Sequence, residues 1–291
     1  MAVLTGRLGH ISKGALGGTG ETAINCVRDW NISLSAELLE MICSASDGAA
    51  ISLDGNRDWT GGWGGYGAIP AAWPGDTFEF EGAITGSAGS AVGASGDCIV
   101  DSVAITWNQE SGAPISHTVN FGGSGELTLG TVTVPADAAV PEPAPSKGCL
   151  LKVANDPFSS FASIGTVRTM TLTLTAANKV IHTAAGAGWP ERKEGNLTGA
   201  VAVTAYADDA DGWASLPQPN AVQALQMFSD DTLYYLIRWI RWGDLGDMGA
   251  NIEGSDMVGG SFSGQFTGFA EVSSTWTKGA ITKPVGGDVW S

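Results

Sequence analysis

The sequence predicts a mainly β protein made of two tandem units, and three observations lead to this fold class. The chain has 291 residues, 42 of them Gly, and the Thr, Ser and Val residues around those glycines are typical of strands and turns. Apolar and polar residues alternate in residues 27–36 and again in residues 167–176, with the period of a strand that has one buried face. The two segments match at an offset of 140 residues (27 to 167), which indicates a repeated unit.

The repeated strand defines a predicted core. In each copy the apolar residues share one parity, so they should point to the same side of the sheet. These core positions are Trp30, Ile32 and Leu34 in the first copy and Met170, Leu172 and Leu174 in the second. A second anchor follows, at residues 58–62 and 196–200, with an offset of 138 residues (60 to 198). Two ordered matches at nearly constant offset favour a tandem duplication.

The duplication and the proline distribution divide the chain. Residues 134–149 are rich in Pro and form the expected linker. The first β domain is then residues 1–133 and the second is residues 150–269. Residues 270–291 form a C-terminal arm whose two tryptophans, Trp276 and Trp290, suit docking on another chain.

Within the first domain, strands are expected after the repeated one at residues 59–66, 76–82, 99–107 and 115–121. A long connection, residues 37–57, precedes them, and its first residues could form a helical turn. Such a long connection inside a compact β unit is usually functional or part of an interface. In the second domain, apolar residues at helical spacing predict a short amphipathic helix at residues 219–228, followed by a buried strand at residues 232–242.

Charge and hydropathy exclude several classes of protein. Asp and Glu outnumber Lys and Arg by 30 to 14, which gives a net charge of −16. Binding of nucleic acid through a basic patch is therefore disfavoured. The acidic composition is consistent with an ordinary acidic protein and also with a surface along which DNA passes without being bound. The longest apolar run, residues 233–240, contains Arg238 and is too short to span a bilayer. The first ten residues lack the apolar core of a secretory signal.

Catalytic and metal-binding motifs are absent from the sequence. There is no GxSxG, HExxH or phosphate-binding glycine loop. The four cysteines have no CxxC spacing, so we expect free thiols rather than a zinc site, with two disulfides as the alternative. We expect neither an enzyme nor a bound cofactor. The 11 tryptophans leave a tandem carbohydrate-binding protein as an alternative, because sugar rings stack on exposed indoles.

The two anchors of the first unit resemble those of a known family. Residues 27–37 (VRDWNISLSAE) and 57–61 (RDWTG) are similar to the strand–loop–strand segment of the major tail-tube proteins of lambda-like, long-tailed bacteriophages. The second copy departs from this pattern, with Met170 in place of Trp30, Ala177 in place of Glu37 and Leu197 in place of Trp59.

The resemblance implies a structural virion protein made of two tail-tube-type β-sandwich domains. Each domain would contribute strands to an inter-subunit β-barrel, so that three chains form a pseudo-hexameric ring. Stacked rings would form the tail tube, a conduit with an acidic lumen through which DNA passes. The implied partners are further copies of the chain and the tail terminator, tape measure and distal tail proteins. The protein would be assembled in the host cytoplasm and located in the virion, away from any membrane. A head-decoration or baseplate protein remains an alternative.

The resemblance also suggests which residues take part in assembly. Rings would stack through the long connection, with its apolar residues Leu38, Leu39 and Ile42, and through Trp276 and Trp290 of the arm. Trp59, at the second anchor, belongs to the same predicted set. Arg28 and Arg168 recur in both copies of a chain with few Arg residues, and either an inter-domain salt bridge or a solvated strand end explains them equally well.

Overall fold

The computed structural model describes fifteen β-strands and one 3-10 turn. It covers residues 9–17, 19–42, 50–84, 89–135, 146, 149–155, 160–164, 166–206, 219–228, 234–245 and 259–266. Every pairing among these strands is antiparallel, and together they form a single sheet. The prediction of a mainly β protein is confirmed. The single sheet differs from the expected pair of sandwiches.

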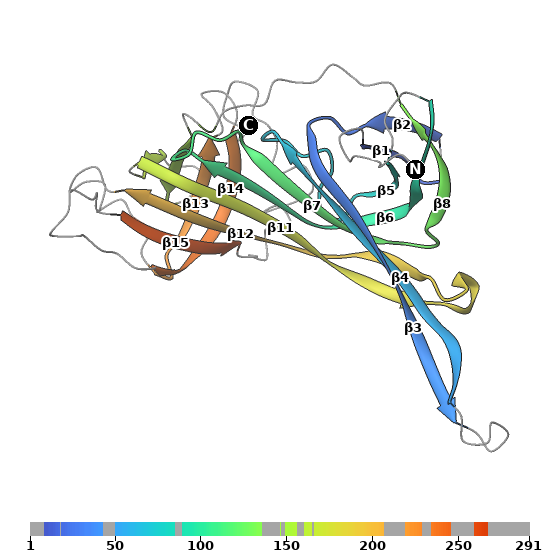
Figure 1. The fold of residues 1–291 in the computed structure, drawn as a ribbon. Helices are drawn as coiled ribbons and strands as arrows, with labels where there is room; N and C mark the ends of the chain where they lie inside the picture. Colours follow the sequence, from blue (N-terminus) through green and yellow to red (C-terminus); the bar gives the residue numbers. More distant parts are fainter. Residues whose placement is uncertain are drawn as a thin grey trace.

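The strands fall into two groups along the chain (Figure 1). The first half contains β1 (His10–Ala15), β2 (Thr19–Ala23), β3 (Val27–Ile42), β4 (Ala50–Tyr66), β5 (Thr77–Ala83), β6 (Gly89–Asn108), β7 (Ser116–Gly123) and β8 (Thr128–Val134). The second half contains β9 (Leu150–Ala154), β10 (Ala162–Ser163), β11 (Thr166–His182), the turn η3 (Ala184–Gly186), β12 (Pro190–Tyr206), β13 (Val222–Phe228), β14 (Tyr234–Leu245) and β15 (Gly259–Phe266).

The two halves have the same strand order. Neighbouring strands follow the order β2-β1-β5-β6-β7-β4-β3 in the first half and β10-β9-β13-β14-β15-β12-β11 in the second. Strand β8, which pairs with the first part of β6, is the one described strand without a described counterpart.

The register of the pairings repeats as well. The strands of the first half are related to their counterparts by fixed offsets: 140 residues for β1, β2, β3 and β4, 145 for β5, 142 for residues 98–103 of β6 and 143 for β7. A bulge in β14 makes the offset 141 for residues 93–96 of β6. The offsets follow from residues that face each other on neighbouring strands in both halves. Each pair of the first half is given with its counterpart in the second: Ser12–Ala23 with Lys152–Ser163, His10–Ala83 with Leu150–Phe228, Phe78–Cys98 with Gln223–Ile240, Val103–Val119 with Leu245–Phe262, Thr60–Gly122 with Ala200–Gln265, and Leu34–Trp59 with Leu174–Gly199. We call residues related by these offsets corresponding residues.

The register corrects the second sequence anchor. Ser33 pairs with Thr60, and Thr173 pairs with Ala200, so the residue that corresponds to Thr60 is Ala200 and not Thr198. The match at an offset of 138 was therefore wrong by two residues. Both hairpins also shift register at the same place, between Val27 and Asp29 and between Val167 and Thr169.

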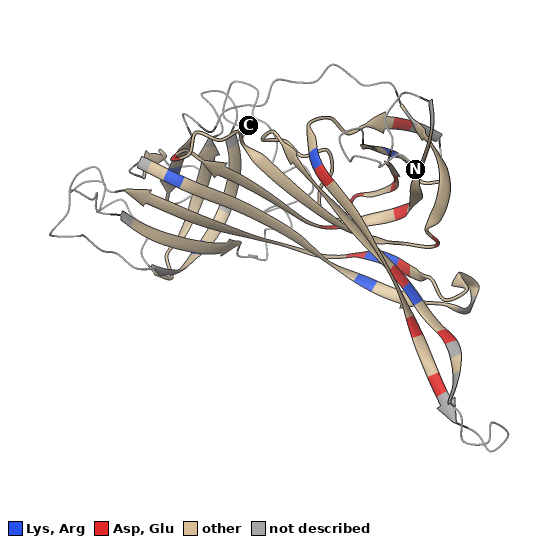
Figure 2. Ribbon diagram, in the orientation of Figure 1, with Lys and Arg blue, Asp and Glu red and all other residues tan. Residues whose placement is uncertain are grey.

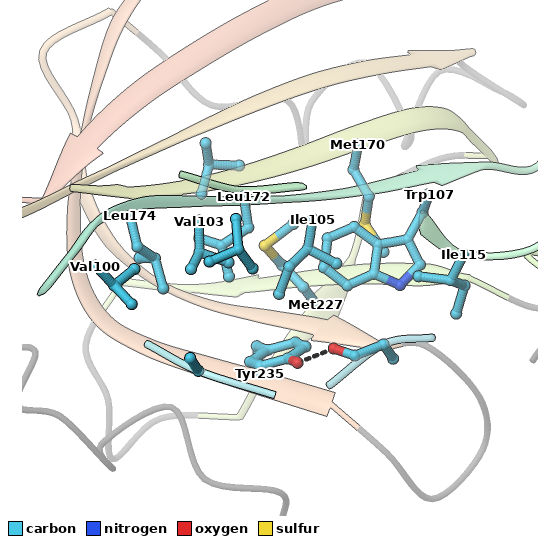
Figure 3. Packing of buried hydrophobic residues seen from close by; sticks show 14 of the residues in the cluster. Val100, Val103, Ile105, Trp107, Ile115, Met170, Leu172, Leu174, Met227 and Tyr235 are labelled. Carbon is cyan, nitrogen blue, oxygen red and sulfur yellow. Dashed lines mark hydrogen bonds between the residues drawn. The ribbon is translucent and has the colours of Figure 1, made fainter. Parts of the chain in front are cut away.

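The halves join by strand pairing and share a core. Residues 102–108 of β6 pair with residues 169–175 of β11, which makes the sheet continuous from one half to the other. Buried side chains of both halves form one cluster beneath this junction (Figure 3). Tyr235 of β14 donates a hydrogen bond to the Ala68 carbonyl, and its ring lies 5.8 Å from that of Trp107. Burial raises the pKa of the Tyr235 hydroxyl, as expected for a phenol that serves only as a donor.

Two local predictions were wrong. The expected helix at residues 219–228 is strand β13, because β9 and β14 lie on either side of it and supply backbone partners along its length. Pairing on both sides overrides a helical spacing of apolar residues. In the region expected as a loop and helical turn, residues 37–42 and 50–57 are the outer parts of β3 and β4, which pair with each other as far as Ile42 and Ala50.

Between Val134 and Leu150 the structure describes no strand, so the linker and the domain boundaries remain predictions. Within the described residues Cys26, Cys98 and Cys149 are not in disulfides.

Candidate assembly interface

The edge of β3 lacks a partner that its counterpart has. Strand β11 pairs with β12 on one side and with β6 on the other, whereas β3 pairs with β4 alone among the described strands. The unpaired stretch, residues 29–35, corresponds to residues 169–175, the part of β11 that joins the halves. A strand edge with unpaired N–H and C=O groups is a template for another strand.

Side-chain burial differs in the same way between the two strands. Leu34 is 54% exposed, whereas the corresponding Leu174 is 0% exposed. Trp30 and Ile32 are half-buried against the core, whereas Met170 and Leu172 are fully covered. The prediction that Leu34 is a core residue is therefore wrong for the single chain, because β3 lies at the edge of the sheet. The predictions for Met170, Leu172 and Leu174 are confirmed.

The outer parts of β3 and β4 form a long hairpin that projects from the rest of the molecule (Figure 1). Two of its predicted assembly residues, Leu38 and Leu39, are 67% and 47% exposed. The second hairpin, β11–β12, carries Val180 and Ile181 in exposed positions on its outer part. Exposed apolar side chains on a projecting hairpin are typical of a contact surface. Ile42 ends β3, but its side chain lies outside the description, as do Trp276 and Trp290.

Charged residues concentrate on these hairpins and at the ends of the sheet (Figure 2). The outer face of the central strands, opposite the core, carries mostly neutral side chains. Its charged residues lie at the margins: Asp29 beside Gly64, Arg241 beside Gln265, and Arg192 with Asp58 over Gly122. One cross-strand row on this face runs through β3, β4, β7, β6, β11 and β12 and consists of Asn31, Gly62, Asn120, Ser102, Thr175 and Thr198. A parallel row runs from β4 to β15 and consists of Tyr66, Ser116, Thr106, Thr171, Ala202 and Ser263.

A shallow depression of about 320 Å³ lies on this face. It is lined by residues of β11, β12 and β15, none of them ionisable. In a chain with a net charge of −16, a neutral face with many hydroxyl groups neither attracts nor repels a polyanion strongly.

The two repeated arginines have different partners. Arg168 forms an ion pair with Glu110, in the turn after β6, so it links the second half of the chain to the first. Its guanidinium also lies 4.7 Å from the centre of the Tyr206 ring, within the range of a cation–π contact. Arg28 pairs with its neighbour Asp29. The inter-domain reading thus fits Arg168, and Arg28 lies on a solvated strand end in the single chain.

Trp59 is not available for contact with another copy. It is 1% exposed, and its Nε1 donates a hydrogen bond to the Gly125 carbonyl at 3.0 Å. A Cβ on Gly123 would lie 2.1 Å from the Trp59 ring, because the indole covers that glycine.

The second half has the same arrangement with the two residue types exchanged. Gly199 corresponds to Trp59, Phe266 corresponds to Gly123, and a Cβ on Gly199 would lie 2.1 Å from the Phe266 ring. In each half, one aromatic ring covers one glycine on the adjacent strand.

One contact between the halves was not predicted. Arg192 of β12 binds Asp58 of β4 through both carboxylate oxygens, at 3.0 and 2.9 Å. The two residues are 134 positions apart. Asp58 lies in the second anchor, but Arg192 belongs to no repeated motif, so no sequence pattern could have paired them. The Arg57 N–H also donates to the Gly188 carbonyl at 2.8 Å, which fixes the first hairpin against the turn of the second.

Carboxylates gather in one more place, on β5. Partial burial, followed by repulsion from neighbouring carboxylates, raises the pKa values of Glu79 and Glu81. Within the described ranges, no group of three or more His, Cys, Asp or Glu residues could hold a metal ion.

Comparison with known proteins adds no family. No protein-family model matches the chain, and no curated protein matches it. In the part of the chain that the structure describes, no helix is long and apolar enough to cross a membrane.

Proposed function

We propose that the protein is a structural subunit that assembles head to tail into closed rings, and that stacked rings form a phage tail tube. The observation that carries the proposal is the repeated register. The halves of one chain join where residues 102–108 of β6 pair with β11. This stretch of β6 corresponds to residues 244–250, of which the structure describes 244 and 245 as the end of β14, and the joining part of β11 corresponds to residues 29–35 of β3. The corresponding stretch of a second copy would supply β3 with the partner that it lacks among the described strands.

Geometry favours a closed ring. Each chain brings two units of the same strand order, which supports a tandem duplication of one tube-type domain. A junction repeated between unlike edges is heterologous, and it closes when the rotation per unit divides a full turn. Six units around one axis correspond to three chains, as the resemblance to tail-tube proteins implies. Contact through strand edges would close the sheet into a barrel, which leaves no edge unpaired.

The neutral face would line the bore. The core and the remaining strands cover one face of the central sheet, so this bulk lies outside the barrel and the uncovered face lies inside. Ser, Thr and Asn side chains then form most of the wall, in place of the acidic lumen that the resemblance implies. Double-stranded DNA carries one negative charge per about 1.7 Å. The middle of the wall has no Lys or Arg, and Arg192 at its margin is already bound to Asp58, so the wall gives DNA few phosphate contacts.

The projecting β3–β4 hairpin is suited to join one ring to the next. Its exposed leucines, Leu38 and Leu39, lie among charged residues, a combination that suits a contact with both apolar burial and orientation. The hairpin is anchored at its base by Asp58 and Arg192, so its direction relative to the ring is fixed.

The carbohydrate-binding alternative has less support. Seven of the eight tryptophans in the described ranges pack into the core or against it, and none of the eight is fully exposed. A platform for sugar rings needs an accessible indole face.

Electron microscopy of the purified protein over a range of concentrations tests the proposal. We expect rings of three chains with sixfold rotational features, and stacks of rings at higher concentration. A variant with Leu38 and Leu39 both changed to Ser should form rings that do not stack. A protein that stays monomeric at every concentration would refute the proposal. Rings that never stack would instead favour a head-decoration or baseplate protein.

A further inference from the structure

The proposed ring contains two kinds of junction. One lies inside each chain, between its first and second halves, and the other lies between the second half of one copy and the first half of the next. We propose that Asp58, Arg192 and Gly122 form a latch that locks the junction inside the chain and is absent between chains. The ring therefore opens and closes only between copies. This inference rests on the proposed function, because the second junction exists only in an assembly.

The latch is a buried arginine with satisfied donors. The Arg192 side chain is 9% exposed. Its Nη2 donates to both carboxylate oxygens of Asp58, and its Nε donates to the Gly123 carbonyl at 2.9 Å. The Arg192 backbone N–H donates to the Ser124 hydroxyl at 3.0 Å. Charge-assisted bonds of this kind are among the stronger polar contacts in proteins, and the carboxylate bonds depend on geometry.

A glycine makes room for the guanidinium. A Cβ on Gly122 would lie 2.3 Å from Cζ of Arg192, so the guanidinium lies directly over the Gly122 backbone of β7. Any side chain at this position would displace Arg192 from Asp58. The latch thus needs three residues from three strands, β4, β7 and β12.

The corresponding residues cannot form this contact. Asp58 corresponds to Thr198, Arg192 to Ser52 and Gly122 to Gln265. The first two side chains are uncharged, and Gln265 carries a side chain where the latch requires none. At the junction between copies, Thr198 and Gln265 of one chain would face Ser52 of the next. That junction depends on strand pairing and on the burial of residues such as Leu34.

Different junction strengths have a consequence for assembly. The latch holds the two halves of a chain in one orientation, so each chain presents its β3 and β14 edges at a fixed angle. Preorganisation of this kind lowers the entropy lost on association. Rings then gain and lose whole chains, and exchange of one half of a chain at a time does not compete with this process.

A graft of the latch onto the other junction tests the inference. The variant Ser52→Arg, Thr198→Asp, Gln265→Gly carries the three latch residue types at the corresponding positions, and all three wild-type side chains are exposed. Hydrogen bonds to charged groups are stronger than those between neutral groups, so we expect the concentration at half-maximal ring formation to fall about tenfold or more in mass photometry. The matched control Ser52→Asp, Thr198→Asp, Gln265→Gly places like charges together and should raise it. A graft with the wild-type midpoint would overturn the inference.

A second measurement applies to the monomer and separates this inference from the proposed function. The variant Asp58→Asn, Arg192→Gln removes both charges of the latch. We expect the amides of residues 102–108 in β6 to exchange hydrogen about tenfold faster, because the junction with β11 opens more often. The corresponding variant Thr198→Asn, Ser52→Gln should leave this exchange unchanged. If exchange is unaffected by loss of the latch, the inference is wrong even when the native protein forms rings.

Discussion

Two corresponding leucines give a matched test of the missing partner at β3. Leu174 is 0% exposed and Leu34 is 54% exposed, although both occupy the same place in a β-hairpin. Truncation of a fully buried leucine costs about 3 kcal/mol, from lost burial and the cavity left behind. Leu34 has less than half of its surface covered, so Leu34→Ala should cost the single chain about 1 kcal/mol or less. The same change removes apolar surface that a neighbouring copy would cover.

Urea denaturation and mass photometry measure the two effects separately. At a concentration where the protein is monomeric, Leu174→Ala should lower the free energy of unfolding about threefold more than Leu34→Ala does. In ring formation, Leu34→Ala should weaken association by about fivefold, which corresponds to about 1 kcal/mol at each junction between chains. If both variants destabilise the monomer equally, or if Leu34→Ala leaves association unchanged, β3 is not the edge that another copy covers.

Three further variants probe packing and protonation. Gly123→Ala should destabilise the fold by about 2 kcal/mol or more, because the new Cβ overlaps the Trp59 ring. The double variant Trp59→Gly, Gly123→Phe exchanges the two residue types as in the second half and should restore most of the lost stability. A fully tolerated Gly123→Ala would contradict this. Burial lowers the pKa of His117 below 6.5, so the unfolded chain binds the proton more readily than the folded chain does. The free energy of unfolding should therefore fall as the pH drops below 6.5, and in urea titrations His117→Gln should show a smaller fall. The raised pKa of Glu79 means that its charged form is disfavoured in the fold, so Glu79→Gln should raise the melting temperature at pH 7, and the gain should vanish near pH 4.

Local alternation was enough to predict the strands and part of the core. Residues 167–176 alternate because β11 lies inside the sheet, and Met170, Leu172 and Leu174 are buried as expected. The same alternation at residues 27–36 predicted a buried Leu34 and was wrong there. Parity states which face a side chain points to, but whether that face is covered depends on strands far away in the chain.

The remaining errors have the same origin. Residues 222–228 contain apolar spacing suited to a helix, yet their neighbours β9 and β14 impose a strand. Arg192 and Asp58 meet across 134 positions because two hairpins cross, and Arg192 lies in no pattern that could have pointed to Asp58. Trp59 matched a family motif and was expected at a surface, but its ring covers Gly123 inside the protein.

The lengths of the segments that connect the strands indicate where the fold tolerates insertions and deletions. From β1 through β4 the halves keep an offset of 140, and in each long hairpin seven residues separate the two strands in the sequence, 43–49 and 183–189. The connection after β4 then gains five residues in the second half and the next loses four. A bulge in β14 adds one residue, and the connection after β14 adds one more. The two long hairpins thus have the same number of residues, whereas the connections on either side of β5 and β13 differ in length between the halves. Peptide insertions for display belong in those turns, where a change in length leaves the strand register intact.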